Sequence, residues 1–191
     1  MRGFVRGFVQ AFVLALGLLI LGATLAPAPA VAANVTPSFD AVEAAPGVSW
    51  ADVAPPSSGW VAVTLPDVWT VRWPDHSGVT WYRLHWQESA PLAPRGLYLR
   101  DMTMAGAIYL NGIEIDRDAH LVEPLSRSWN VPRYFSLHAP LLKEGRNELL
   151  VRVSGLSNFQ PGLGAVSLGP PDALRAQADR DRRDDLAGFC V

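Results

Sequence analysis

The dipeptide Asn111-Gly112, set between two short apolar runs, most constrains how this chain can fold. Ala107-Ile108-Tyr109-Leu110 precedes it and Ile113-Glu114-Ile115 follows it, and both runs contain the β-branched and aromatic residues that favour strands. A two-residue type I′ turn needs positive φ at both central residues, which asparagine and glycine adopt at low cost. The stretch Ala105–Asp116 therefore predicts a β-hairpin. Because one hairpin is marginally stable by itself, its partner strands must come from elsewhere in the chain.

Six other segments also carry the features of strands. They alternate apolar with polar residues or are rich in strand-forming residues, and turn residues such as proline and glycine bound them. The six are Trp60–Leu65, Val79–Gln87, Gly96–Arg100, Arg133–Leu137, Glu148–Val153 and Ala165–Leu168. With the hairpin they give about eight antiparallel strands, which is typical of an all-β sandwich or jelly roll. Pro140–Gly145 is predicted to form one helical turn that ends at its glycine.

The longest predicted strand, Val79–Gln87, would present two different faces. Side chains alternate along a strand, so Tyr82, Leu84 and Trp86 are expected to point into the core. The residues expected to point the other way are Trp81, Arg83, His85 and Gln87.

The two ends of the chain differ from this strand-rich part. Met1–Ala32 has the pattern of a secretory signal peptide, with two arginines, an uninterrupted apolar run and small residues before a cut. The expected location is therefore periplasmic or secreted, and the alternative is an uncleaved N-terminal membrane anchor. Residues 33–58 are predicted to be a lead-in segment and residues 59–169 the jelly roll. Residues 170–191 are predicted to be a charged tail, disordered or helical, that adds nothing to the fold.

Charge and cysteine content exclude some functions. The net charge is −2, and no basic stripe supports nucleic-acid binding. Cys190 is the single cysteine, so no disulfide can form within the chain and the fold must depend on its core. The thiol of Cys190 could still join two chains into a disulfide-linked dimer.

Three motifs follow one another in a characteristic order: Gly78–Arg83 (GVTWYR), Ala107–Gly112 (AIYLNG) and Leu142–Val153 (LKEGRNELLVRV). In this order they resemble the galactose-binding-domain-like jelly roll, best known as the sugar-binding domain of β-galactosidases and β-glucuronidases. The resemblance covers Trp60–Gly169. It implies a galactose-binding-like β-sandwich and a carbohydrate or another small molecule as the ligand.

The segment Glu123–Asn130, with Arg133-Tyr134-Phe135, resembles a narrower group more closely. This group comprises the periplasmic jelly-roll input domains of membrane-bound histidine kinases and diguanylate cyclases. Such proteins continue into transmembrane helices and a cytoplasmic signalling domain. The resemblance implies a membrane signalling partner, with this chain either a stand-alone module or a truncated sensor.

The candidate ligand-binding residues combine aromatic rings with planar polar groups. Sugars bind through a flat aromatic ring against their C–H face and through polar groups that pair with hydroxyls. The candidates are Trp81, Arg83 and His85 on the long strand, Arg127, Trp129 and Asn130 in a later loop, and Trp69 and Trp73 in the loop before the strand. A purely structural role is the alternative: Trp81 would then cover the sheet, and Arg83 would pair with a carboxylate such as Asp67.

Catalytic, metal and cofactor sites find no support in the sequence. Asp75, Asp101, Glu114 and Asp118 show no spacing that selects a pair for glycoside hydrolysis, and no Gly-x-Ser-x-Gly motif occurs. The four histidines are scattered without the spacing of zinc ligands. We therefore predict a non-catalytic, exported binding or sensing module without a cofactor. The alternatives are a carbohydrate-binding accessory domain of a polysaccharide-processing system and a structural, protein-binding jelly roll.

Overall fold

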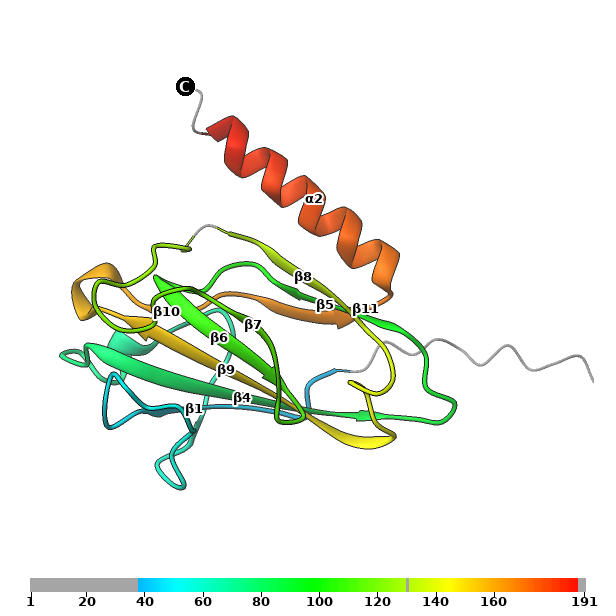
Figure 1. The fold of residues 1–191 in the computed structure, drawn as a ribbon, viewed down its shortest axis with the longest axis horizontal. Helices are drawn as coiled ribbons and strands as arrows, with labels where there is room; N and C mark the ends of the chain where they lie inside the picture. Colours follow the sequence, from blue (N-terminus) through cyan, green and yellow to red (C-terminus); the bar gives the residue numbers. More distant parts are fainter. Residues whose placement is uncertain (1–37, 130, 189–191) are drawn as a thin grey trace, which may run out of the picture. The chain divides into compact units, whose positions relative to one another are not determined.

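A computed structural model describes residues 38–129 and 131–188, which form a β-sandwich with a long helix packed against it (Figure 1). The predicted signal peptide, Asn130 and Cys190 lie outside the described residues. The strands are β1 (Ala41–Pro46), β2 (Val61–Ala62), β3 (Asp67–Val68), β4 (Gly78–Glu88), β5 (Arg95–Leu99), β6 (Ala105–Leu110), β7 (Ile113–Arg117), β8 (Arg133–Leu137), β9 (Gly145–Gly155), β10 (Gly162–Leu163) and β11 (Val166–Gly169). Two 3₁₀ turns, η1 (Trp69–Val71) and η2 (Ser157–Phe159), and the helix α2 (Pro171–Gly188) complete the elements.

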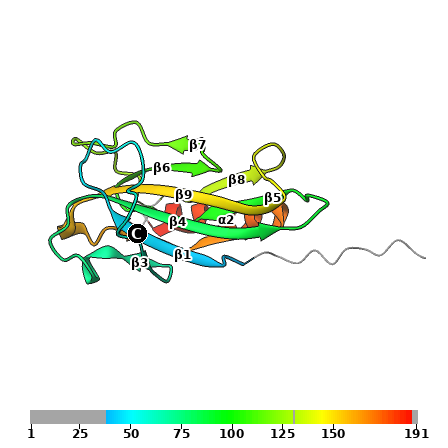
Figure 2. The ribbon, with the colours of Figure 1, turned by 90° about the horizontal axis from the view of Figure 1, so that it is seen from below.

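The strands form two main antiparallel sheets. The large sheet has the order β2-β1-β4-β9-β6-β7, and the small sheet has the order β11-β5-β8. A short third sheet joins β10 to β3. Figure 1 shows the large sheet, the small sheet and α2 as successive layers, and Figure 2 shows β6, β9, β4 and β1 side by side in the large sheet.

The core lies between the two main sheets. Alternation along β4 turns Tyr82, Leu84 and Trp86 toward the small sheet, as expected, and all three are buried. β9 adds Leu149, Val151 and Val153 from the neighbouring positions, and the small sheet adds Leu97, Leu99 and Leu137. This apolar layer, free of disulfides among the described residues, provides the hydrophobic stabilisation of the sandwich.

The predicted hairpin is confirmed. Asn111 has φ 52° and Gly112 has φ 84°, the positive values that a type I′ turn requires. The turn joins β6 to β7 with Leu110 opposite Ile113. β6 also pairs with β9, so the hairpin is joined to the longest ladder of the sheet and β7 forms its edge.

A hydrogen-bonded cluster of Asp67, Arg72 and Tyr82 links the core to the loop before β4. The Tyr82 hydroxyl donates to Asp67 at 2.8 Å, and both terminal nitrogens of Arg72 donate to the same carboxylate. Burial, reinforced by this negative charge, raises the pKa of Tyr82 far above its usual value, so the hydroxyl stays protonated. Asp67, the carboxylate suggested as a partner of Arg83, thus forms its ion pair with Arg72. Arg83 pairs with Glu43 instead.

The predicted boundary between a lead-in segment, residues 33–58, and the jelly roll is wrong, because residues 33–58 contain the strand β1. Ala41–Pro46 pairs along its whole length with β4, with Glu43 opposite Arg83. Its sequence, AVEAAP, has only one β-branched residue, so its strand state depends on this pairing rather than on local preference. The described sandwich therefore begins before residue 59.

Three other local predictions need correction. Trp60–Leu65 yields only the two-residue β2, because only two residue pairs join it to β1. Pro140–Gly145 forms no helix: its first residues are a turn, and its last residue, Gly145, already belongs to β9. Asn147 bonds the backbone of Lys143 and Gly145 there. Glu148–Val153 is the middle of the longer β9.

The charged tail, predicted to add nothing to the fold, forms α2 and packs on the small sheet. Leu174 and Ala178 are buried against Tyr98 of β5. Asp181 accepts a hydrogen bond from the Tyr98 hydroxyl. The two apolar residues, Leu174 and Ala178, stand four positions apart, a helical spacing that is hard to recognise among the surrounding aspartates and arginines.

Replacing Gly112 by valine should lower the free energy of unfolding by about 1–3 kcal/mol. No atom lies within 4 Å of a Cβ placed there, so the cost comes from the backbone, which has φ +84°. Gly112→Asn is the control, because asparagine tolerates left-handed backbone. Urea unfolding measures both variants, and equal midpoints would contradict the turn assignment.

Replacing Leu174 by alanine should lower the free energy of unfolding by about 0.5–3 kcal/mol, because the side chain packs on Tyr98. Arg183→Ala, at an exposed position of the same helix, is the matched control and should change stability by less than about 0.5 kcal/mol. Thermal unfolding of both variants measures the difference. Equal melting temperatures would show that α2 does not stabilise the sandwich.

Candidate functional site

The candidate site lies on the outer face of the large sheet, the face turned away from the core. Strand alternation places Arg83 and His85 of β4 on this face, with Arg146 and Glu148 of the neighbouring β9. The register sets His85 directly opposite Glu148. Cross-strand neighbours on one face lie within side-chain reach, so these groups form a single cluster.

These side chains surround an open hollow of about 620 Å³. Two flanking turns complete it: the hairpin turn contributes Asn111 and Gly112, and the turn before β9 contributes Lys143. The described residues that line it are Arg83, His85, Asn111, Gly112, Lys143, Arg146 and Glu148. Three carry a positive charge and one a negative charge, so the hollow is polar and basic.

The hydrogen bonds around His85 fix its tautomer. A guanidinium can only donate, so Arg146 Nη2, at 3.0 Å from His85 Nδ1, makes this ring nitrogen an acceptor. The proton of a neutral imidazole then resides on Nε2, which donates to Glu148 Oε2 at 2.9 Å. His85 thereby connects a cation to an anion across the floor of the hollow.

Arg83 is held at the other side of the hollow by two contacts. Its Nη2 donates to Glu43 Oε2 of β1 at 2.8 Å, and the guanidinium lies 4.1 Å from the centre of the Trp60 ring. Stacking on an aromatic face and an ion pair both favour one fixed orientation of an arginine. Arg83 therefore covers one face of the Trp60 ring.

An amide network shapes the turn that carries Lys143 and Arg146. The buried Asn147 accepts from the Asn111 amide and from the backbone N–H of Lys143, and its own amide donates to the carbonyls of Lys143 and Gly145. Asn111 Nδ2 also donates to the carbonyl of Leu141, and its oxygen accepts the N–H of Glu148. The hairpin turn and the β9 turn are thus one hydrogen-bonded unit at the rim of the hollow.

Of the candidate residues predicted from the sequence, Arg83 and His85 line the hollow. Trp81 is 1% exposed, and its ring lies 6.0 Å from that of Tyr109 under covering segments, so it fits the structural alternative. Trp129 packs on the cluster around Leu121 and Leu125, with its ring 5.7 Å from Phe159. Arg127 is exposed but does not line the hollow.

The two tryptophans of the earlier loop lie elsewhere as well. Trp69 is completely buried, and its indole N–H donates to the carbonyl of His76 at 3.0 Å. Trp73 is half-buried beneath the guanidinium of Arg72, 5.0 Å from its ring centre. Both rings pack against His76 and give the loop its shape.

Three residues that line the hollow were not predicted from the sequence: Lys143, Arg146 and Glu148. Arg146 and Glu148 stand at alternate positions of β9, so the alternation that singled out Arg83 and His85 would have found them once the pairing with β4 was known. Lys143 carries no such signal, because the side chain of Asn147 determines its turn. Asn111 was assigned to the turn alone, yet it also borders the hollow.

The described residues contain neither a metal-binding cluster nor a membrane-spanning helix. No group of three or more histidine, cysteine, aspartate or glutamate side chains is arranged there to hold a metal ion. Within the same residues, no helix is long and apolar enough to cross a membrane.

Comparison with known proteins identifies the fold. No protein-family model matches the chain, and no curated protein sequence does. Solved structures of glycosidases do match. A family 2 glycosyl hydrolase from Bacteroides cellulosilyticus aligns with a TM-score of 0.51 and 14% identity, over 70% of this chain and 20% of that chain. A calcium-binding mutant of Bacteroides uniformis beta-glucuronidase 2 aligns with a TM-score of 0.50 and 20% identity, over 69% of this chain and 17% of that chain.

This chain has the β-sandwich fold of those glycosidase domains. A beta-glycosidase from Bacteroides vulgatus matches similarly, with a TM-score of 0.50 and 15% identity over 70% of this chain. The resemblance to glycosidase domains that the three motifs predicted is thus confirmed for the fold. The chain spans about a fifth of the length of the glycosidases it matches, 20% for the Bacteroides vulgatus protein.

Replacing Asn147 by alanine should lower the free energy of unfolding by about 1–3 kcal/mol, because it leaves buried backbone groups of the β9 turn without partners. Glu144→Ala, an exposed change in the same turn, is the control and should shift stability by less than about 0.5 kcal/mol. Urea unfolding measures both. A variant Asn147→Ala as stable as the control would show that the amide network does not hold the rim.

Proposed function

We propose that this domain is a non-catalytic module that binds a carbohydrate in the hollow on the outer face of the large sheet. The observation that carries the proposal is the convergence of Arg83, His85, Arg146 and Glu148 from two paired strands, with Asn111 and Lys143 from two linked turns. The volume of about 620 Å³ falls in the usual range of small-molecule sites.

The chemistry of the lining suits a ligand with many hydroxyls. Guanidinium and ammonium groups donate to hydroxyl oxygens, and a carboxylate accepts from hydroxyl protons. Charge-assisted hydrogen bonds of this kind are stronger than neutral ones. The cation–anion chain Arg146–His85–Glu148 keeps these groups oriented before a ligand arrives, which reduces the entropy lost on binding.

A non-catalytic role is supported by the number of carboxylates that line the hollow. Glycoside hydrolysis uses two carboxyl groups on either side of the scissile bond. Among the described residues that line the hollow, Glu148 is the one carboxylate, and its oxygen is engaged with His85. The matched glycosidases extend far beyond the aligned part, so their activity does not transfer to this domain.

Within this proposal the module is exported and serves as the sensing input domain of a bacterial membrane signalling protein. Residues 1–32 support export through their signal-peptide pattern. The resemblance of Glu123–Asn130 to periplasmic input domains supports the sensing role. A carbohydrate-binding accessory role in a polysaccharide-processing system would use the same hollow.

Binding is tested by titrating the protein with a panel of mono- and oligosaccharides in a calorimeter. The double variant Lys143→Ala with Arg146→Ala should weaken the binding of any positive sugar by about tenfold or more, since it removes two charged donors from the rim. Arg180→Ala, an exposed arginine of α2, is the control and should bind like the unchanged protein.

Two outcomes would overturn the proposal. Full affinity in the double variant would place the sugar elsewhere, and no heat or thermal shift with any sugar would favour the structural, protein-binding alternative.

A further inference from the structure

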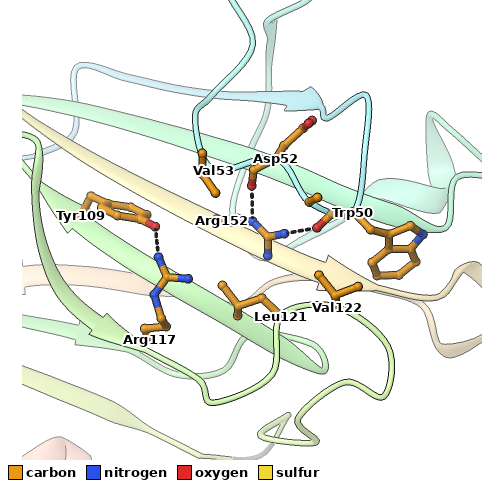
Figure 3. A pocket seen from close by; sticks show the side chains of 9 residues that line it. Trp50, Asp52, Val53, Tyr109, Arg117, Leu121, Val122 and Arg152 are labelled. Carbon is orange, nitrogen blue, oxygen red and sulfur yellow. Dashed lines mark hydrogen bonds between the residues drawn. The ribbon is translucent and has the colours of Figure 1, made fainter.

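A second, smaller cavity lies beside Arg152 at another part of the same sheet face. Its volume is about 90 Å³. Figure 3 shows the guanidinium of Arg152 in the middle of the lining residues, with Asp52 and Val53 above it, Leu121 and Val122 below it, and Tyr109 and Arg117 to one side. The described residues that line it are Trp50, Ala51, Asp52, Val53, Tyr109, Arg117, Leu121, Val122 and Arg152.

Arg152 is a buried cation held by uncharged oxygens. The residue is 2% exposed. Its Nε donates to the carbonyl of Asp52 at 2.9 Å and its Nη2 to the carbonyl of Trp50 at 2.7 Å. Its Nη1 donates to the hydroxyl of Ser154 at 2.6 Å. These three bonds leave two of the five N–H groups of a guanidinium for another acceptor.

The carboxylates near this cavity are committed to other groups. Asp52 turns its Oδ2 to the backbone N–H groups of Val48 and Ser49, at 2.7 and 3.0 Å. Glu114 pairs with Arg117 at 2.6 Å and so balances that second arginine. Among the described residues, the charge of Arg152 is thus left without an ion-pair partner, and burial lowers its pKa.

An uncompensated buried charge is unfavourable, and an anion beside it would relieve this cost. Arg117 also lines the cavity, but its charge is balanced by Glu114, so Arg152 is the group that would hold the anion. The remaining walls come mostly from Trp50, Val53, Leu121 and Val122. Asp52 also lines the cavity, with its Oδ2 held by the backbone N–H groups of Val48 and Ser49. Small-molecule sites combine mostly apolar walls with a few polar or charged groups that orient the ligand.

We propose that this cavity binds a small monocarboxylate with a short apolar tail, its carboxylate on Arg152 and its tail between Leu121, Val122 and Trp50. Size supports the assignment, because an apolar cavity of about 150 Å³ accommodates benzene. A space of about 90 Å³ therefore suits acids of the size of acetate or propionate. This site is separate from the hollow, since the two share no lining residue.

The test is an NMR titration of the full chain with acetate, propionate and butyrate in chloride-free buffer. Saturable shifts of the Arg152 Nε–H and the Trp50 indole N–H are expected, together with a raised melting temperature. Arg152→Gln should weaken binding by about tenfold or more, because an amide keeps hydrogen bonding but loses the charge.

Two exposed valines provide a variant pair that leaves Arg152 in place. Val122, 46% exposed, lines the cavity, whereas Val131, 47% exposed, does not. Val122→Trp should block the cavity and abolish the Arg152 shifts, and Val131→Trp should leave them unchanged. This pair decides the question even if Arg152→Gln fails to fold.

Three results would overturn the proposal: no shift at Arg152 with any of the three acids, equal binding by Val122→Trp and the unchanged protein, or a response to chloride or phosphate without a response to carboxylates. Because the saccharide titration depends on Lys143 and Arg146, failure at either site leaves the other test intact.

Discussion

The pairing of β4 with β9 is the constraint on which the rest of the structure depends. The two strands match over eleven residue pairs, from Gly78 opposite Gly155 to Glu88 opposite Gly145. Because side chains alternate with a period of two, a slip of one residue would turn the core side chains of β4 to solvent and bring Arg83 and His85 into the core. Burial of Tyr82, Leu84 and Trp86 therefore fixes the register, and the same register places His85 against Glu148.

Local preferences explain which parts of the fold could be predicted. The hairpin turn, β4 and β8 carry turn chemistry or alternation in their own sequence, and the structure has them as expected. β1 is alanine-rich and becomes a strand through its pairing with β4. The helical alternative predicted for the tail agrees with α2, but the packing of this helix on Tyr98 was not predicted. Such tertiary contacts override local propensity, so sequence alone could not supply them.

The candidate site also has features that could be predicted from local sequence and features that depend on tertiary packing. Alternation along one strand was enough to single out Arg83 and His85, but it could not show that Trp81 is covered by other segments. The segments that cover part of the sheet also explain why its outer face carries two different sites, a small cavity and an open hollow. Where Leu121 and Trp50 lie over the strands, the remaining space is small and mostly apolar, with Arg152 buried beside it. Where nothing among the described residues covers β4 and β9, charged groups face an open hollow.

The contacts that attach α2 to the small sheet affect which part of the domain unfolds first. Leu174 and Ala178 provide its apolar contact with Tyr98, and the other ties are polar, such as Arg100 to Asp185 at 2.8 Å. Contacts of this size contribute less free energy than the core between the sheets. The helix can therefore separate as a unit while the sandwich stays folded, and its backbone amides should exchange with solvent deuterium sooner than those of β4 and β9. The described domain thus has at least two levels of cooperativity, with the helix as the less stable part.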